Sequence, residues 1–276
     1  MSSFLYPPVR PLAVAEVLDL AVQIFKATVV RCIPYGILAV AFEQLPNIHD
    51  LGSGAIRQPF GGGRPIWLVL FVLGTLLALM MWSALLLRQR AIIEHTPTAF
   101  KTELAETLRR LTSFVVATVL VFVAIGAPLT LLLVVPASVH WWLRIPLIAL
   151  GLYLAVLFSS TWPAVMLARQ GPLRALRHSV CLVWGNWWRV VAVYGVGAVA
   201  VLVLAILVSV LIALVVPTLV ADIPVMMAVF TVLANAMFAI VAPFVGALLL
   251  AVFGELRARK EGADLEQRIA GLAAVE

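Results

Sequence analysis

Charged residues are scarce in this 276-residue sequence: Asp, Glu, Lys and Arg make up 12% of it, whereas apolar residues make up 64%. Water-soluble domains contain about 25% charged and about 45–50% apolar residues. A soluble fold could not bury so large an apolar share, so the composition excludes an ordinary water-soluble protein. It indicates an integral membrane protein, because several apolar stretches reach the roughly 20 residues that a helix needs to cross a bilayer.

Cysteines and catalytic motifs are also few or absent. The two cysteines, Cys32 and Cys181, fall near predicted cytoplasmic ends of helices, where thiols stay reduced, so no disulfide is expected. The four histidines are scattered, and none has another His or Cys at metal-ligand spacing. No serine lies in a nucleophile elbow, and no pair of acids is placed for hydrolysis. The sequence therefore favours a protein that is not an enzyme and that has no metal or cofactor.

Six apolar runs are long enough to be membrane-spanning helices, which predicts an all-α, polytopic helical bundle. The first residues lack the basic and apolar regions of a signal peptide, so these runs are expected to direct insertion themselves. The fifth run is long enough to hide a break. The predicted spans are residues 28–45, 65–87, 112–136, 145–168, 188–216 and 225–253.

Basic residues divide unequally between the two sides of these six spans. Sixteen of the 19 Lys and Arg fall on the side that carries both chain ends, and only Arg57, Arg64 and Arg144 fall on the other. Cytoplasmic loops are enriched in Lys and Arg, so both termini are predicted to be cytoplasmic. The same rule explains the net charge of +6 without a nucleic-acid partner.

Each predicted cytoplasmic segment that leads into a pair of spans begins with a proline, which suits the first turn of a helix. Each then alternates apolar and charged residues with helical periodicity, which predicts an amphipathic helix lying at the membrane surface. In the second, Phe100 and Leu108 are expected on the apolar face, opposite Glu103. The three predicted surface helices are residues 11–26, 97–111 and 172–187.

One surface helix followed by one two-span hairpin recurs three times, which suggests three parallel repeats. The alternative is that any polytopic protein with short basic loops has this appearance. The repeats would belong to a single membrane domain, residues 1–253, followed by a cytoplasmic tail, residues 254–276. The candidate repeats are residues 11–96, 97–171 and 172–253.

Polar groups at membrane depth are costly and often functional. Glu43 is the only acid inside a predicted span, and an interfacial carboxylate reached by water is favoured over an ion or proton site. For Asn235, in the middle of the sixth span, a hydrogen bond between helices is favoured over a substrate contact. Ser159, Ser160 and Thr161 precede a proline in the fourth span, where hydroxyls can satisfy a carbonyl that the proline leaves free.

Several arginines in the predicted cytoplasmic loops are candidates for contact with anionic lipid headgroups, each such contact contributing about 1 kcal/mol. Membrane lipids are therefore the expected partners. A membrane-protein partner or a homo-oligomer stays open. The candidate headgroup-binding residues are Arg88, Arg90, Arg109, Arg110, Arg174 and Arg177.

Short motifs along nearly the whole chain resemble a bacterial membrane family. They are Arg10-Pro11-Leu12 with Glu16-Val17-Leu18-Asp19, Gly171-Pro172-Leu173-Arg174-Ala175-Leu176, and the tail from Leu256 to Gly262 followed by Asp264-Leu265. The family is named for the membrane domain of glycerophosphoryl diester phosphodiesterase and includes stand-alone relatives. The resemblance implies a six-span inner-membrane module concerned with lipids or the envelope. It does not imply an enzyme, because the soluble phosphodiesterase barrel is absent. At Gly254-Glu255 the chain departs from the aromatic-Asp pair of family members.

The favoured function is thus a non-enzymatic, lipid-associated membrane module. The alternative is a transporter or permease for a small or lipid-like substrate, in which the proline-containing third, fourth and sixth spans line a path past Asn235. An integral-membrane enzyme that acts on lipid has the least support, because paired acids and an activated nucleophile are missing.

Overall fold

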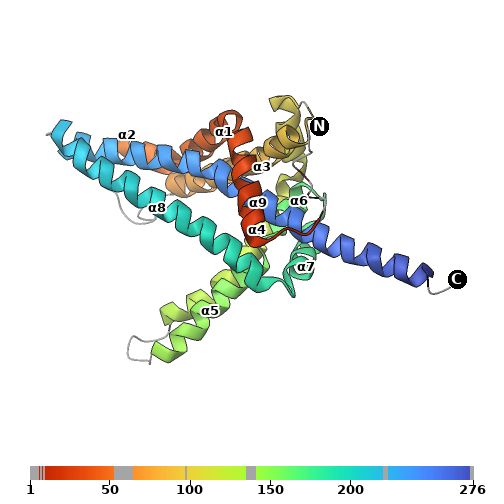
Figure 1. Ribbon diagram of the computed structural model, residues 1–276. Coiled ribbons are helices and arrows are strands. Elements are labelled where there is room, and N and C mark those ends of the chain that lie inside the picture. The colour runs from red at the N-terminus through yellow and green to blue at the C-terminus, as the bar shows by residue number, and fades with distance from the viewer. Residues whose placement is uncertain are drawn as a thin grey trace. The chain divides into compact units, whose positions relative to one another are not determined.

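The computed structural model describes residues 6, 8, 10–52, 65–96, 98–134, 141–219 and 223–273, and these form helices and turns without a strand (Figure 1). The all-α prediction is confirmed. The helices are α1 (Val14–Glu43), α2 (Leu45–Gly52), α3 (Pro65–Ile93), α4 (Phe100–Val134), α5 (Trp141–Leu157), α6 (Thr161–Met166), α7 (Pro172–Val183), α8 (Trp187–Leu219) and α9 (Ile223–Ala273).

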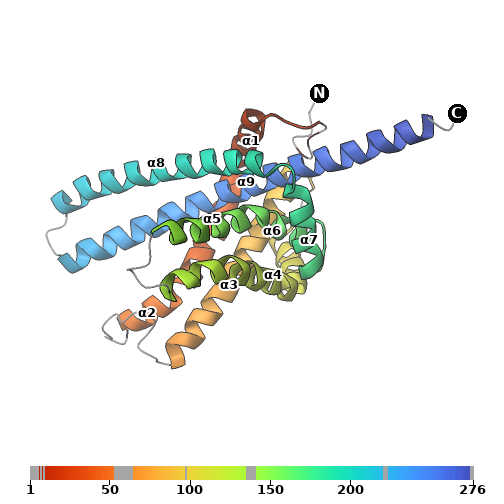
Figure 2. The same cartoon turned by 90° about the horizontal axis from the view of Figure 1, so that it is seen from below.

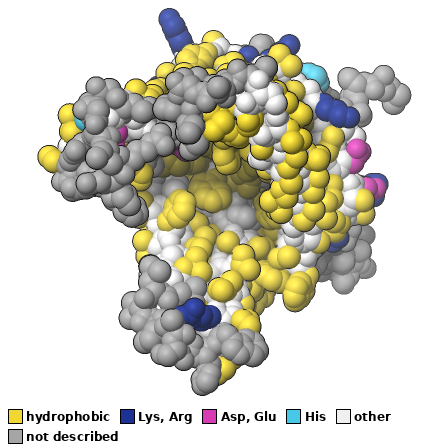
Figure 3. Space-filling model, turned by 90° about the vertical axis from the view of Figure 1, so that its left-hand side faces the viewer, with side chains coloured by type: hydrophobic (Ala, Val, Ile, Leu, Met, Phe, Trp, Pro, Cys, Tyr) yellow, Lys and Arg dark blue, Asp and Glu magenta, His cyan; other side chains and the backbone are white. Residues whose placement is uncertain are grey.

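Six segments of the described chain are long and apolar enough to cross a membrane, which confirms the predicted multi-pass character. Their outward-facing side chains are largely apolar: on the face that Figure 3 shows, hydrophobic residues make up most of the described surface. Such a surface suits contact with lipid acyl chains rather than water. The segments are Val14–Glu43, Pro65–Ile93, Phe100–Leu131, Arg144–Met166, Trp187–Thr218 and Val229–Lys260.

The chain divides into two compact units, each assembled from separate stretches. The first unit comprises Met1–Ala21, Leu108–Tyr194 and Leu248–Glu276, and the second comprises Val22–Thr107 and Gly195–Ala247. The helices α1, α4, α8 and α9 therefore contribute residues to both units. The threefold repeat stays a prediction.

In the first unit, the fourth span is broken between α5 and α6. A turn at residues 158–160 separates the two helices, and α6 packs against α7 (Figure 2). The hydroxyl of Ser179 donates to the carbonyl of Leu157 at 2.8 Å, at the end of α5. In contrast, α8 is continuous from Trp187 to Leu219, so the length of the fifth span does not conceal a break. Hydroxyl-rich Ser159-Ser160-Thr161 is the sequence at which the fourth span turns.

In the second unit, two glycines allow close contacts with backbone carbonyls. A Cβ atom on Gly36 would overlap the carbonyl oxygen of Ala239, and one on Gly74 would overlap that of Phe42. Each carbonyl lies four residues before a proline, so it cannot accept the usual helical hydrogen bond from that position. The Cα–H groups of the two glycines lie against these freed oxygens instead. Close approach at small residues is a characteristic mode of helix association in membranes.

Gln89, in α3, is fully buried and connects three helices of the second unit. Its Nε2 donates to the carbonyl of Pro243 at 2.7 Å and to the hydroxyl of Thr28 at 3.3 Å. A Cβ atom on Gly246 would overlap the Gln89 amide oxygen, so the absence of a side chain there makes room for the amide.

The three predicted surface helices differ in the structure. Helix α7 is a separate helix with Pro172 in its first turn, as predicted. The first two are instead continuous with the spans that follow, in α1 and α4, and α1 begins at Val14 rather than at Pro11. Pro97 lies outside the described residues. The predicted tail from residue 254 continues α9 as far as Ala273.

Three residues at the start of α4 depart from the predicted apolar and polar faces, although Arg109 is exposed as expected. Leu108 is 61% and Phe100 is 46% exposed, whereas Glu103 is 3% exposed. The prediction assumed that the charged face would meet water. Instead the carboxylate of Glu103 is satisfied by protein donors inside the second unit, and the exposed apolar residues suit lipid contact.

Candidate functional site

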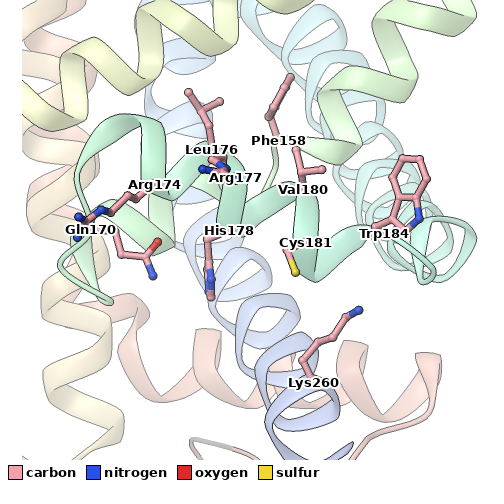
Figure 4. Close-up of a pocket in the computed structure, with 10 residues that line it drawn as sticks. All are labelled: Phe158, Gln170, Arg174, Leu176, Arg177, His178, Val180, Cys181, Trp184 and Lys260. Carbon is pink, nitrogen blue, oxygen red and sulfur yellow. The ribbon is translucent and has the colours of Figure 1, made fainter. Parts of the chain in front are cut away.

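A groove of about 890 Å³ lies beside α7 in the first unit (Figure 4). Helix α7 forms its main wall, and Lys260 reaches it from α9. Pro172 in the first turn and Gly185 just beyond the last, with a φ of +85°, define where the α7 segment starts and stops. The residues that line the groove are Phe158, Gln170, Arg174, Leu176, Arg177, His178, Val180, Cys181, Trp184 and Lys260.

The amphipathic character of α7 turns its cations toward the groove. One face of the helix is buried, including Ala175 and Ser179. Arg174, Arg177 and Cys181 are three and four residues apart, so they share another face, and all three are exposed. Two guanidinium groups one helical turn apart can bind the same oxyanion or two neighbouring ones.

Three cationic side chains of the groove form no ion pair with any described residue: Arg174, Arg177 and Lys260. The imidazole of His178 packs edge-on against the ring of Phe253, with 6.3 Å between the centroids. The groove therefore carries three uncompensated positive charges, an arrangement that attracts anions.

Apolar side chains complete the groove. Leu176, Val180 and Phe158 line it together with Trp184, whose side chain is 64% exposed. Leu173, one residue before Arg174, is 67% exposed. A site with cations beside exposed apolar groups suits an amphiphile whose anionic head and apolar tail meet different surfaces.

Two of the other candidate headgroup arginines have protein partners. Arg88 pairs with the buried carboxylate of Glu103 at 3.0 Å, and Arg90 pairs with Glu94 at 2.7 Å, four residues along α3. Glu103 also accepts hydrogen bonds from the hydroxyls of Tyr35 and Thr98. These two arginines are therefore largely neutralised within the second unit.

The remaining two candidates, Arg109 and Arg110, are adjacent on α4 and do not line the groove. Arg109 is exposed. Arg110 donates to the carbonyl of Val165 in α6 at 3.4 Å. Of the six predicted headgroup contacts, the structure thus brings only Arg174 and Arg177 together at one site.

The intramembrane polar candidates lie elsewhere. Asn235 accepts a hydrogen bond from the side-chain amide of Gln44 at 3.4 Å, and Gln44 in turn accepts one from Asn47 at 2.7 Å. Glu43 is exposed. Gln44, between α1 and α2, and Asn47, in α2, thus connect to Asn235 in α9 within the second unit, which supplies the hydrogen bond that a mid-span amide needs.

The three hydroxyl residues of the fourth span are buried at the break between α5 and α6. Ser159 donates to the carbonyl of Val156 at 2.8 Å. The hydroxyls of Ser160 and Thr161 have no hydrogen-bond partner in the described part of the chain. None of the three lines the groove.

A second buried carboxylate escaped the sequence analysis. Glu255, 2% exposed, lies 3.3 Å from Arg189 and accepts hydrogen bonds from Arg259 at 2.9 and 3.0 Å in the first unit. The spacing from Glu255 to Arg259 is visible in the sequence as an i,i+4 pair. The contact with Arg189 depends on tertiary packing, as does the presence of Lys260 in the groove, so no local pattern could have identified either.

Comparison with protein-family models, curated proteins and solved structures finds no match. No group of three or more His, Cys, Asp or Glu that could hold a metal ion occurs among the described residues. The geometry of the groove is therefore the basis for a functional proposal.

Proposed function

We propose that this chain is a non-enzymatic, multi-pass protein of a bacterial inner membrane that binds anionic lipid headgroups in the α7 groove. The observation that carries the proposal is a set of three cations, Arg174, Arg177 and Lys260, which have no ion-pair partner among the described residues and lie beside exposed apolar side chains. Arginine is suited to phosphate because its planar guanidinium can donate two parallel hydrogen bonds. In the predicted topology this groove faces the cytoplasmic leaflet, where anionic lipids create a negative surface potential.

The contrast with the second unit supports this assignment. Arg88 and Arg90 have carboxylate partners within hydrogen-bond distance, so a lipid phosphate would have to compete with an existing ion pair. No described carboxylate competes at the groove. The transporter alternative gains no comparable support, because the amide of Asn235 already has a partner in Gln44.

Native mass spectrometry of the purified protein tests the proposal by counting retained anionic lipids. The groove variant replaces Arg174, Arg177 and Lys260 by Gln. A matched control replaces Lys26, Arg31 and Lys101 by Gln, three exposed cations outside the groove, and so makes the same change in net charge.

We expect the groove variant to retain several-fold less anionic lipid than the wild type, and the control to retain nearly as much as the wild type. Equal retention by the two variants would show that the lipid responds to net charge alone. That result would remove the groove as the binding site.

A further inference from the structure

We infer that the α7 groove is built for a lipid whose headgroup carries two phosphate groups rather than one. The inference rests on the proposed function and concerns which anionic lipid the site takes. It follows from how the positive charges are divided between two helices and from how large the groove is.

The positive charge of the groove comes from two walls. Arg174 and Arg177 lie one turn apart on α7, whereas Lys260 extends from α9 (Figure 4). A single phosphodiester carries one negative charge and can be held by the arginine pair, which leaves the ammonium group of Lys260 uncompensated. A second phosphate in the same headgroup can meet Lys260 while the first stays on α7. A headgroup with two negative charges also matches the three positive charges of the groove more closely than a headgroup with one.

The size of the groove points the same way. Its volume of about 890 Å³ is near the upper end of the range of about 300–1,000 Å³ that holds a drug-sized ligand. One phosphate occupies a small part of such a space. Two phosphates joined by a short linker span more of it, and the acyl chains can leave past the exposed ring of Trp184.

The two cysteines provide a direct assay on the full chain. Cys181 is exposed and lines the groove, whereas Cys32 is buried, and there is no third cysteine. A bound headgroup should slow the reaction of Cys181 with a charged maleimide. Absence of labelling at Cys32 in the same sample shows that the protein is folded. The C181S variant measures the labelling that does not come from Cys181.

The labelling rate is measured in neutral-detergent micelles doped with cardiolipin, which has two phosphates and a linker hydroxyl, or with phosphatidylglycerol, which has one phosphate. Total lipid phosphate is kept equal in the two series. We expect cardiolipin to protect half of Cys181 at a lipid-phosphate concentration about fivefold lower than phosphatidylglycerol requires. This ratio corresponds to about 1 kcal/mol, the contribution of one additional cation near a phosphate. The K260Q variant should lose this preference and keep the weaker protection by phosphatidylglycerol.

The outcomes separate the inference from the proposed function. Equal protection by both lipids at matched phosphate overturns the inference and leaves the lipid-binding proposal standing. Protection by neither lipid overturns both. Inorganic pyrophosphate forms a third series: if it protects Cys181 as well as cardiolipin does, the site takes a soluble diphosphate, and the assignment to a lipid is wrong.

Discussion

The close approach of Gly36 to the carbonyl of Ala239 gives a sharp prediction about packing in the second unit. In the G36A variant the added methyl group would overlap that backbone oxygen, and a backbone atom cannot turn aside as a flexible side chain can. The two helices must separate locally. The same substitution in G195A, in α8, places the methyl group where no atom lies within 4 Å.

The expected magnitude combines two opposing effects. Overpacking of a closely packed site costs about 1–3 kcal/mol. Replacing glycine by alanine inside a helix contributes about 0.5–1 kcal/mol of stability through the backbone entropy of the unfolded state. The second effect is common to both variants, so the free energies of unfolding of G36A and G195A should differ by the packing cost alone, about 1–3 kcal/mol.

Reversible unfolding in mild detergent by added SDS measures this difference, and the eight tryptophans provide the fluorescence signal. G36A should unfold at a lower SDS fraction than the wild type, and G195A at the same or a higher one. If the two variants unfold together, α1 and α9 do not approach each other at this glycine, and the packing described for the second unit is wrong.

Two further predictions concern buried polar groups of the second unit. E103Q leaves Arg88 without its counter-charge. Breaking a fully buried ion pair costs about 3–5 kcal/mol, and E103Q should destabilise the protein by less than this because the Arg88 side chain is 25% exposed. Replacing both residues by apolar ones should recover most of the loss in the same SDS titration, whereas additive losses from the two substitutions would exclude the pairing. Q89M keeps the length of the side chain and removes an amide oxygen for which the described residues supply no donor, but it also removes the two hydrogen bonds that Nε2 donates to Pro243 and Thr28. It should therefore lower the free energy of unfolding by about 1–3 kcal/mol. Q89E, which puts a carboxylate near the carbonyl of Pro243, should be clearly less stable, and equal stability of the two variants would contradict the buried position of the amide.

The helical spans could be predicted from the sequence because a long apolar segment inside a bilayer finds no water to hydrogen-bond its backbone. Its N–H and C=O groups must bond to each other, and a helix satisfies all of them within the segment. The number of spans, their approximate positions and Pro172 at the start of α7 followed from local chemistry, whereas several span boundaries did not, because α1 and α4 begin well before the predicted spans. The start of α4 could not be predicted from amphipathicity, because the rule that polar faces meet water fails where lipid is the solvent. Glu103 is buried since Tyr35 and Arg88, distant in sequence, supply its hydrogen bonds.

The candidate site was only partly visible in the sequence. Arg174 and Arg177 were visible as cations spaced by one turn, and their amphipathic helix is formed. The sequence could not distinguish them from Arg88, because its partner Glu103 lies 15 residues away and on another helix. The pairing of Arg90 with Glu94 did have a local signal, the i,i+4 spacing. Lys260 joins the groove through the packing of segments more than 75 residues apart, for which no local signal exists.

The break between α5 and α6 has a mechanical consequence. A continuous helix can adjust to a change in bilayer thickness only by tilting as a rod or by deforming the lipid around it. The 23-residue span Arg144–Met166 has an alternative, because the turn at residues 158–160 lets α5 change its inclination while α6 stays packed on α7. The bond from Ser179 to Leu157 then marks the pivot, so membranes of different thickness can be accommodated without moving α7, the main wall of the groove.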